Sequence, residues 1–250
     1  MNTQTTVSSW KPVLLLLIGI LCSAPAYSKE KSFSSGDQKV LLVELFTSEG
    51  CSSCPPAEQW INDLKGHPRL WKDFVPVAFH VDYWDYIGWK DPFASTRHSI
   101  RQQKYKRLGN LSQVYTPGMM LDGKEWRSWR NANAIKPSNE KAGSLSVAVS
   151  NGRVTARYTP ATDLSGDELI LNVAVLGFDL VSDVRAGENA GRRLQQEFVV
   201  LGHTTQSSSN GTWELVLPDV DPSHAMTPGI AVWVSKRGRL APIQATGGLL

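Results

Sequence analysis

The chain has 250 residues, of which 26 are Lys or Arg and 23 are Asp or Glu, and its formal net charge is +3. This near balance argues against a nucleic-acid-binding protein, which would need a marked excess of basic residues on one face. The length is sufficient for one or two domains with a proper hydrophobic core.

The N-terminus, residues 1–28, has the features of a secretion signal. Lys11 precedes an apolar run at residues 13–21, and a small-x-small cleavage pattern ends at Ala26. We predict cleavage after Ala26, with Ser28 as the alternative. No later apolar run reaches the length of a membrane span. The protein is therefore expected to be exported, periplasmic or secreted, with no membrane span after cleavage.

Strand-like and helix-like segments alternate between residues 39 and 135, which we predict to be the first domain. Apolar runs predict strands at residues 40–46, 74–81 and 119–121, and helical spacing predicts helices at residues 56–64 and 95–108. Such alternation is typical of an α/β layer fold. The polar residues 29–38 before this domain are expected to form a loose leader.

The pattern changes in the second predicted domain, residues 144–250, where apolar and polar residues alternate as in half-buried strands. Asn151-Gly152 lies between two such runs and predicts a hairpin turn. Further strands are expected near residues 169–178, 195–201, 212–217, 230–235 and 240–245. This half is predicted to be an all-β, sandwich-like domain, joined to the first by a linker at residues 135–143.

Cys51 and Cys54 carry the strongest functional signal. They follow a predicted strand and precede a predicted helix. The unpaired N–H groups and positive dipole end of that helix favour a thiolate there. Because Cys22 is expected to leave with the signal, the pair contains the only cysteines of the mature chain. A bridge this short constrains the unfolded chain little, so the pattern indicates a thiol–disulfide redox site.

Three other residues fit such a site. Thr116-Pro117 directly precedes a predicted strand, where a cis-proline packs against the cysteine pair in thioredoxin-like folds. We therefore predict a cis bond there, and a role for both residues in substrate binding. Glu44 interrupts an apolar strand. It is either a buried carboxyl that accepts the proton of Cys54 or a residue facing the strand's exposed side.

These motifs resemble the domain-of-unknown-function 1223 family of secreted thioredoxin-like proteins. The similar stretches are ELFTSEGCSSCPPA at residues 44–57, HVDYWD at 80–85, GWKDPF at 88–93, YTP at 115–117, and GEN, GR and L within 187–194. The resemblance implies a thioredoxin-like α/β domain followed by a β-rich region, and it supplies no substrate. Ser-Ser replaces the Gly-Pro of thioredoxin between the cysteines, so the direction of electron flow stays open.

The main hypothesis is that the protein is a thiol–disulfide oxidoreductase acting on protein or low-molecular-weight disulfides. Cys51 attacks as the thiolate, and Cys54 then resolves the mixed disulfide. Trp84 and Trp89, in an aromatic loop after the second strand, are candidate substrate-binding residues. A redox partner would restore the pair, and no cofactor is expected.

Two alternatives belong to other classes. Copper(I) and zinc bind thiolates, and His80 is placed to add an imidazole, which would make the protein a metal-binding or delivery module. One CxxC with one His is a weak metal signal, and a hydrogen-bonded core histidine is the simpler interpretation. In the other alternative the disulfide is structural, and the aromatic loop or the β-rich half binds another protein.

Overall fold

Strands predominate in the computed structural model, which describes residues 1–2, 30–130, 135–164, 166–224 and 226–250. The strands are β1 (Lys31–Ser34), β2 (Leu41–Thr47), β3 (Phe74–His80), β4 (Gly118–Leu121), β5 (Lys124–Glu125), β6 (Gly143–Ser150), β7 (Arg153–Pro160), β8 (Leu169–Gly177), β9 (Leu180–Asp183), β10 (Arg193–Gln196), β11 (Val199–Ser208), β12 (Thr212–Val216), β13 (Pro228–Lys236) and β14 (Pro242–Leu249). The α-helices among these residues are α1 (Pro55–Asn62) and α2 (Thr96–Arg107).

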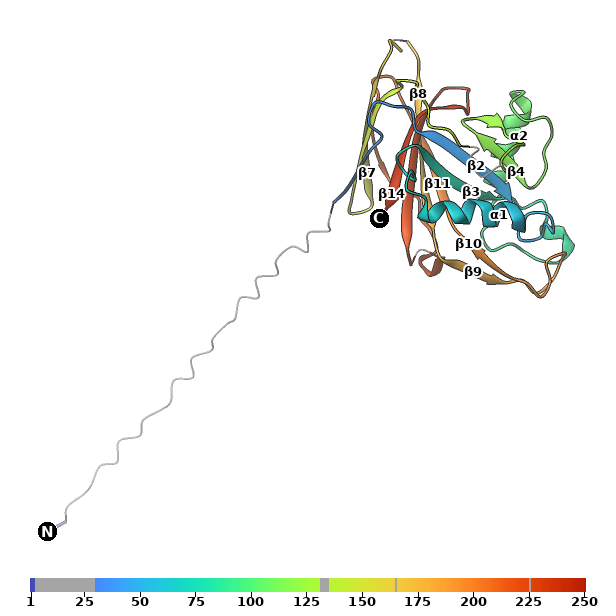
Figure 1. Cartoon of the computed structure of the whole chain (residues 1–250). Coiled ribbons are helices and arrows are strands. Elements are labelled where there is room, and N and C mark those ends of the chain that lie inside the picture. The colour runs from blue at the N-terminus through green and yellow to red at the C-terminus, as the bar shows by residue number, and fades with distance from the viewer. Residues whose placement is uncertain (3–29, 131–134, 165, 225) are drawn as a thin grey trace.

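An eight-stranded mixed sheet forms the centre of the molecule, in the order β14-β13-β8-β11-β3-β2-β4-β5 (Figure 1). Its central strands are apolar on both faces, and all seven residues of β3 are buried. Strands covered on both sides have this composition because neither face meets water. β2 and β3 run parallel, with Leu41 opposite Phe74 at one end and Thr47 opposite His80 at the other.

A second sheet, β1-β6-β7-β12, packs against one part of the large sheet. Along β7 buried and exposed residues alternate, as expected when only one face is covered. Its inward side chains, such as Leu145 and Trp213, share a core with Val173 and Val232 of β8 and β13. The hairpin turn predicted at Asn151-Gly152 is confirmed, and both residues have positive φ.

The two α-helices lie on opposite faces of the large sheet. Successive side chains of a strand point to opposite faces. Thr47 of β2 donates to Glu58 of α1, whereas the Phe46 ring packs against Tyr105 of α2, with ring centroids 6.1 Å apart. Each helix therefore covers its own side, and the chain between β2 and α1 passes over the end of the sheet.

The expected fold class, an α/β thioredoxin-like domain followed by a sandwich-like all-β region, is wrong. β11 pairs in parallel with β3 and antiparallel with β8, so strands of both expected halves belong to one sheet. The main core cluster likewise combines Leu42 and Phe79 with Phe198 and Trp233. The error arose because local patterns identify strands but carry no information on pairing between distant ones.

The polar stretch expected to be a loose leader contains a strand. β1 pairs antiparallel with β6, and Phe33 packs against the core of the smaller sheet. The predicted secretion signal, with Lys11, Ala26 and Ser28, lies outside the described residues, apart from residues 1–2. None of the described helices combines the length and apolar character required to cross a membrane.

Candidate functional site

Cys51 and Cys54 form a disulfide at the start of α1, with Cα atoms 5.4 Å apart. Cys54 is the N-cap of the helix, and its carbonyl accepts hydrogen bonds from the backbone N–H groups of Ala57 and Glu58. Both cysteines are buried, with 1% of Cys51 and none of Cys54 exposed, while the two serines between them are exposed. The bridge is therefore covered in this state.

A loop between β9 and β10, which we call the cover loop (residues 184–192), lies against the cysteine segment. The exposed Glu188 carboxylate accepts hydrogen bonds from the Ser52 N–H and hydroxyl groups, at 3.0 and 2.6 Å. The buried Asn189 amide donates to the carbonyls of Glu49 and Cys51, at 2.8 and 3.0 Å. These bonds fix the cover loop to both sides of Cys51.

The aromatic loop after β3 packs beside the same segment. Trp84 donates from Nε1 to the Thr116 hydroxyl at 2.7 Å, and Trp89 donates to the Glu49 carboxylate at 2.9 Å. A Cβ atom added at Gly50 would lie 3.1 Å from the Cβ of Trp84, so only glycine fits here without displacement. The structure thus brings Trp84, Trp89 and Thr116 to the cysteine segment, as the assignment to one site requires.

The Thr116–Pro117 bond is cis, which confirms the prediction. The next residue, Gly118, pairs with Phe46 of β2, so the proline lies level with the end of that strand. The cysteine loop leaves β2 at this end. Thr116 and Pro117 are both half-buried, and they border the aromatic loop through Trp84.

Glu44 does not belong to this group. Its side chain and that of Thr47 point to opposite faces of β2, so Glu44 faces α2. There Arg101 donates to its carboxylate at 2.7 Å, and the Tyr105 hydroxyl also donates to it. Arg101 in turn stacks over the Phe79 ring. The buried carboxyl predicted at this position is present, but both its oxygens are occupied on the face away from α1.

Instead, four buried ionisable residues are connected to one another on the α1 side of the sheet. We call Glu49, Glu58, His80 and Asp91 the acid–histidine cluster. Asp91 accepts from His80 Nδ1 at 2.8 Å and from the Glu49 N–H at 2.9 Å, and Glu58 accepts from the Thr47 hydroxyl at 2.7 Å. Nε2 of His80 is buried and has no hydrogen-bond partner.

Burial and charge shift the proton affinities of this cluster strongly. Burial raises the pKa of Glu58 to about 7, against the attraction of His80. Burial alone would lower the pKa of His80, but Asp91, Glu58 and Glu49 outweigh it and raise that pKa to about 9. Burial and the charge of Asp91 raise the pKa of Glu49. The cluster therefore holds an exchangeable proton near neutral pH.

Comparison of the sequence with known protein families gives one match that spans this site. The family model described as a protein of unknown function, DUF1223, matches residues 42–235. The chain belongs to the DUF1223 family. This match includes the cysteines, the acid–histidine cluster and the cover loop.

Two solved structures are similar to this DUF1223 chain. A crystal structure of a protein from Agrobacterium tumefaciens is 24% identical, with a TM-score of 0.62, and the match covers 85% of this chain and 95% of that one. HBP35 of Porphyromonas gingivalis is 15% identical, with a TM-score of 0.51, covering 85% of this chain and 76% of that one. At such identities the likeness shows the fold alone. No curated protein matches the chain.

Sequence reasoning missed several residues of this DUF1223 site. Glu58 was visible in principle, because a residue four positions after Cys54 on a helix shares its face. Glu188 and Asn189 lie in a stretch noted for its family resemblance. No local pattern predicts that they contact the cysteine segment, which lies more than 130 residues earlier in the chain. The pairing of His80 with Asp91 likewise requires the folded chain.

The metal alternative finds no ligand set in the part of the chain that the structure describes. No group of three or more His, Cys, Asp or Glu side chains there is arranged to hold a metal ion. His80 lies opposite Thr47 on the neighbouring strand, and its Nδ1 is bound to Asp91. It is the hydrogen-bonded core histidine of the simpler interpretation.

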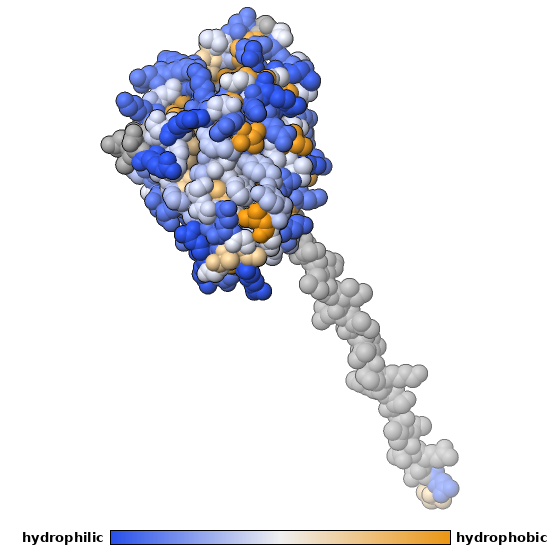
Figure 2. All heavy atoms as spheres, turned by 90° about the vertical axis from the view of Figure 1, so that its right-hand side faces the viewer, coloured by the Kyte–Doolittle hydropathy of each residue, from blue (hydrophilic) through white to orange (hydrophobic). Residues whose placement is uncertain are grey.

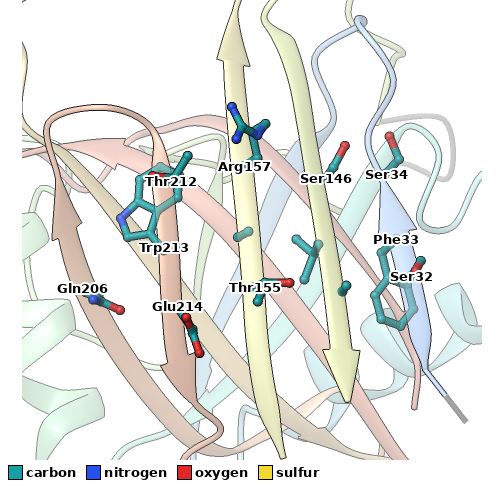
Figure 3. Close-up of a pocket in the computed structure, with 13 residues that line it drawn as sticks. Ser32, Phe33, Ser34, Ser146, Thr155, Arg157, Gln206, Thr212, Trp213 and Glu214 are labelled. Carbon is teal, nitrogen blue, oxygen red and sulfur yellow. The ribbon is translucent and has the colours of Figure 1, made fainter.

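A hollow of about 850 Å³ lies elsewhere, on the smaller sheet (Figure 3). Ser34, Ser146, Arg157 and Thr212 form a row across its four strands, and the small hydroxyl side chains leave space above the sheet. Neither the cysteines nor the acid–histidine cluster line it. The hollow is therefore separate from the cysteine site.

Proposed function

We propose that this protein is an exported thiol–disulfide oxidoreductase that exchanges electrons through Cys51 and Cys54. The observation that carries the proposal is the disulfide at the N-terminus of α1, four residues before the buried Glu58, whose pKa burial raises to about 7. A bridge between residues three apart contributes little to stability through loop closure. Stability alone is thus a poor reason for the pair.

The chemistry follows from the position of the two sulfurs. In the reduced protein the Cys51 thiolate attacks a disulfide of the substrate, breaks its S–S bond and forms a mixed disulfide, while one substrate thiol leaves. Cys54 then attacks Cys51 Sγ, which releases the second substrate thiol and closes the protein disulfide. The substrate gains two electrons and two protons, and the pair loses them. A redox partner restores the dithiol.

Access to the pair requires movement of the cover loop. Its contact with Ser52 through Glu188 is exposed, so water can replace these hydrogen bonds at little net cost. Figure 2 views the molecule from the right-hand side of Figure 1, and this face is mostly hydrophilic, with small separate hydrophobic patches. When the loop moves, Trp84, Trp89, Thr116 and Pro117 would border the substrate.

The test combines a reduction potential with single cysteine variants. We expect equilibrium with glutathione to give a potential above about −300 mV, the range of exchangeable bridges. Cys51→Ser should abolish reduction of a protein disulfide such as that of insulin, and Cys54→Ser should accumulate mixed disulfide. A bridge that resists glutathione, or full activity in Cys51→Ser, would overturn the proposal in favour of a structural disulfide.

A further inference from the structure

We propose that Glu58 is the proton acceptor for Cys54 during resolution, and that His80, held by Asp91, is the positioning residue that keeps Glu58 in its reactive carboxylate form. This inference rests on the proposed function. It concerns two buried groups to which the sequence pattern assigned no part in proton transfer.

The first argument is the geometry of α1. Cys54 has helical dihedral angles, φ −78° and ψ −37°, and the Glu58 N–H donates to its carbonyl at 3.1 Å. Residues four apart on a helix lie one above the other, with Cβ atoms about 5–6 Å apart. Cys54 is fully buried and Glu58 is only 3% exposed, so both lie on the covered face of the helix. The carboxyl is thus the ionisable side chain one turn below the resolving sulfur.

The second argument is the place of His80. Thr47 and His80 are opposite one another on β2 and β3, and the Thr47 hydroxyl donates to Glu58 Oε1 at 2.7 Å. His80 therefore lies on the same face of the sheet, next to Glu58. Its Nδ1 is bound to Asp91, and its buried Nε2 has no partner. A protonated imidazole in this position attracts the carboxylate of Glu58 without neutralising it by a direct hydrogen bond.

The groups that face Glu58 from each neighbouring element determine its pKa. Thr47 comes from β2, His80 from β3, Asp91 from the loop after β3, and the neutral Gln196 from β10. His80 lowers the pKa of Glu58, and Asp91 raises it to a smaller extent. Burial has the largest effect, and the result is a carboxyl that is partly ionised near pH 7.

Glu44 cannot replace Glu58 in this role. It faces α2 on the other side of the sheet, and Arg101 and Tyr105 occupy its two oxygens. Its carboxylate is therefore committed to the buried Arg101 guanidinium, away from the helix that carries Cys54. Glu58 lacks such a partner, and it shares a helix face with the sulfur from which the proton must leave.

The proton transfer fits into a balanced sequence. Once Cys51 is in the mixed disulfide, the Cys54 thiol gives its proton to the Glu58 carboxylate. The resulting thiolate attacks Cys51 Sγ, the Cys51–Cys54 bond forms, and the bond between Cys51 and the substrate breaks. The leaving substrate thiolate takes up this proton from Glu58, directly or through water. Glu58 then returns to its starting state, with no further reactant consumed.

A chromogenic disulfide, dithionitrobenzoate, separates the two steps when it is mixed with the reduced full chain. Attack by Cys51 releases the first coloured thiolate, and resolution by Cys54 releases the second. In Glu58→Gln we expect the second release to slow about 100-fold at about pH 7, the usual contribution of a general base. The rate should recover towards wild type at about pH 9.5, where a thiol ionises unaided. The first release should be unchanged.

Three further variants keep the test decisive. Glu58→Asp retains a carboxyl and should keep a pH inflection in the second release, which also serves if the amide variant folds poorly. His80→Gln removes the positive charge and should move that inflection to higher pH, an effect that a merely structural role would not produce. Asp63→Asn removes the exposed carboxylate at the C-terminal end of α1 and should change neither release.

The outcomes separate the inference from the function on which it rests. A second release that is unchanged in Glu58→Gln at every pH, or one that slows equally with the first, would overturn the role of Glu58. An inflection that stays in place in His80→Gln would overturn the role of His80. If the wild-type protein shows no first release at all, the proposed oxidoreductase function itself fails.

Discussion

At the scale of single residues, the acid–histidine cluster couples proton binding to stability. The pKa of His80 is raised from 6.5 to about 9. The stabilisation of the folded state by protonated His80 is therefore complete below pH 6.5 and is lost as the pH rises through about 9. The pKa of Glu58 is raised from 4.5 to about 7, and a raised carboxyl pKa makes the folded state progressively less stable as the pH rises between these values.

We therefore predict that the unfolding free energy of the oxidised protein falls steadily from about pH 5 to about pH 9, by a few kcal/mol in total. Glu58→Gln should remove the fall below about pH 7, because the amide does not titrate. Asp91→Asn should remove the fall above pH 6.5, because His80 then loses its main partner. Urea unfolding at several pH values measures each curve.

The variants serve as controls for one another, since each should flatten a different part of the curve. A wild-type stability that is constant across this range would contradict the raised pKa values of Glu58 and His80. A fall that persists unchanged in both variants would place its origin in other groups.

Glu44 provides a second prediction at this scale. Glu44→Gln leaves the buried Arg101 guanidinium without a counter-charge, which usually costs about 3–5 kcal/mol. The second release of the dithionitrobenzoate reaction should nevertheless keep its wild-type pH profile. Glu44 lies on the sheet face that α2 covers, away from Cys54 and Glu58. Unfolding and reaction rate are measured on the same preparation. A lost inflection would return the proton-transfer role to Glu44.

At the scale of elements, the cover loop is hydrogen-bonded to the segment that carries the disulfide. The Asn189 amide connects it to the carbonyls of Glu49 and Cys51. Losing these buried hydrogen bonds costs about 1–3 kcal/mol. We predict that Asn189→Ala raises the rate at which dithiothreitol reduces the bridge by about tenfold, as expected when an opening becomes about 1.4 kcal/mol easier.

The matched control is Asn210→Ala, the same change in an exposed turn between β11 and β12, where the side chain bonds only to nearby groups. It should leave the reduction rate unchanged. Equal rates for wild type and Asn189→Ala would mean that the bridge opens by another route.

Local elements were predictable because their signals are local. The apolar run ending at Phe46, the proline-led helix after Cys54 and the hairpin at Asn151-Gly152 all formed where the pattern placed them, within one or two residues. The cis bond at Pro117 was also predicted. These features depend on residues within one turn or one strand, where periodicity and turn chemistry decide the conformation.

Pairings between distant elements were not predictable in this way. β8 and β13 are buried almost throughout, which is typical of central strands and not of one face of a sandwich. The folded chain shows this burial, but the sequence of these strands does not identify their partners. Only the folded chain shows that Val199 pairs with Ala78, and that Asn189 meets Cys51.

At the scale of the whole molecule, the continuous sheet implies one cooperative unit. Phe198 begins the connection between the two halves, since its carbonyl accepts from the Ala78 N–H and its ring packs on Trp71 and Phe178. Because this buried ring contacts both halves, unfolding of either half would remove packing contacts from the other. Separate unfolding of residues 39–135 and 144–250 would require this contact and the β3–β11 pairing to break first.

We predict that Phe198→Ala lowers the unfolding free energy by about 3–5 kcal/mol, as truncation of a buried ring usually does. Native-state hydrogen exchange should show the same loss of protection for amides of β2 and of β13, although these strands belong to different expected domains. Val216→Ala, an apolar truncation at a side chain 61% exposed on the edge strand β12, should change neither by more than about 0.5 kcal/mol. If only β13 and its neighbours lost protection, the halves would be independent units that merely touch. The cover loop, which comes from the second half, could then leave Cys51 without disturbing the first, and control of the disulfide would belong to domain separation instead of loop opening.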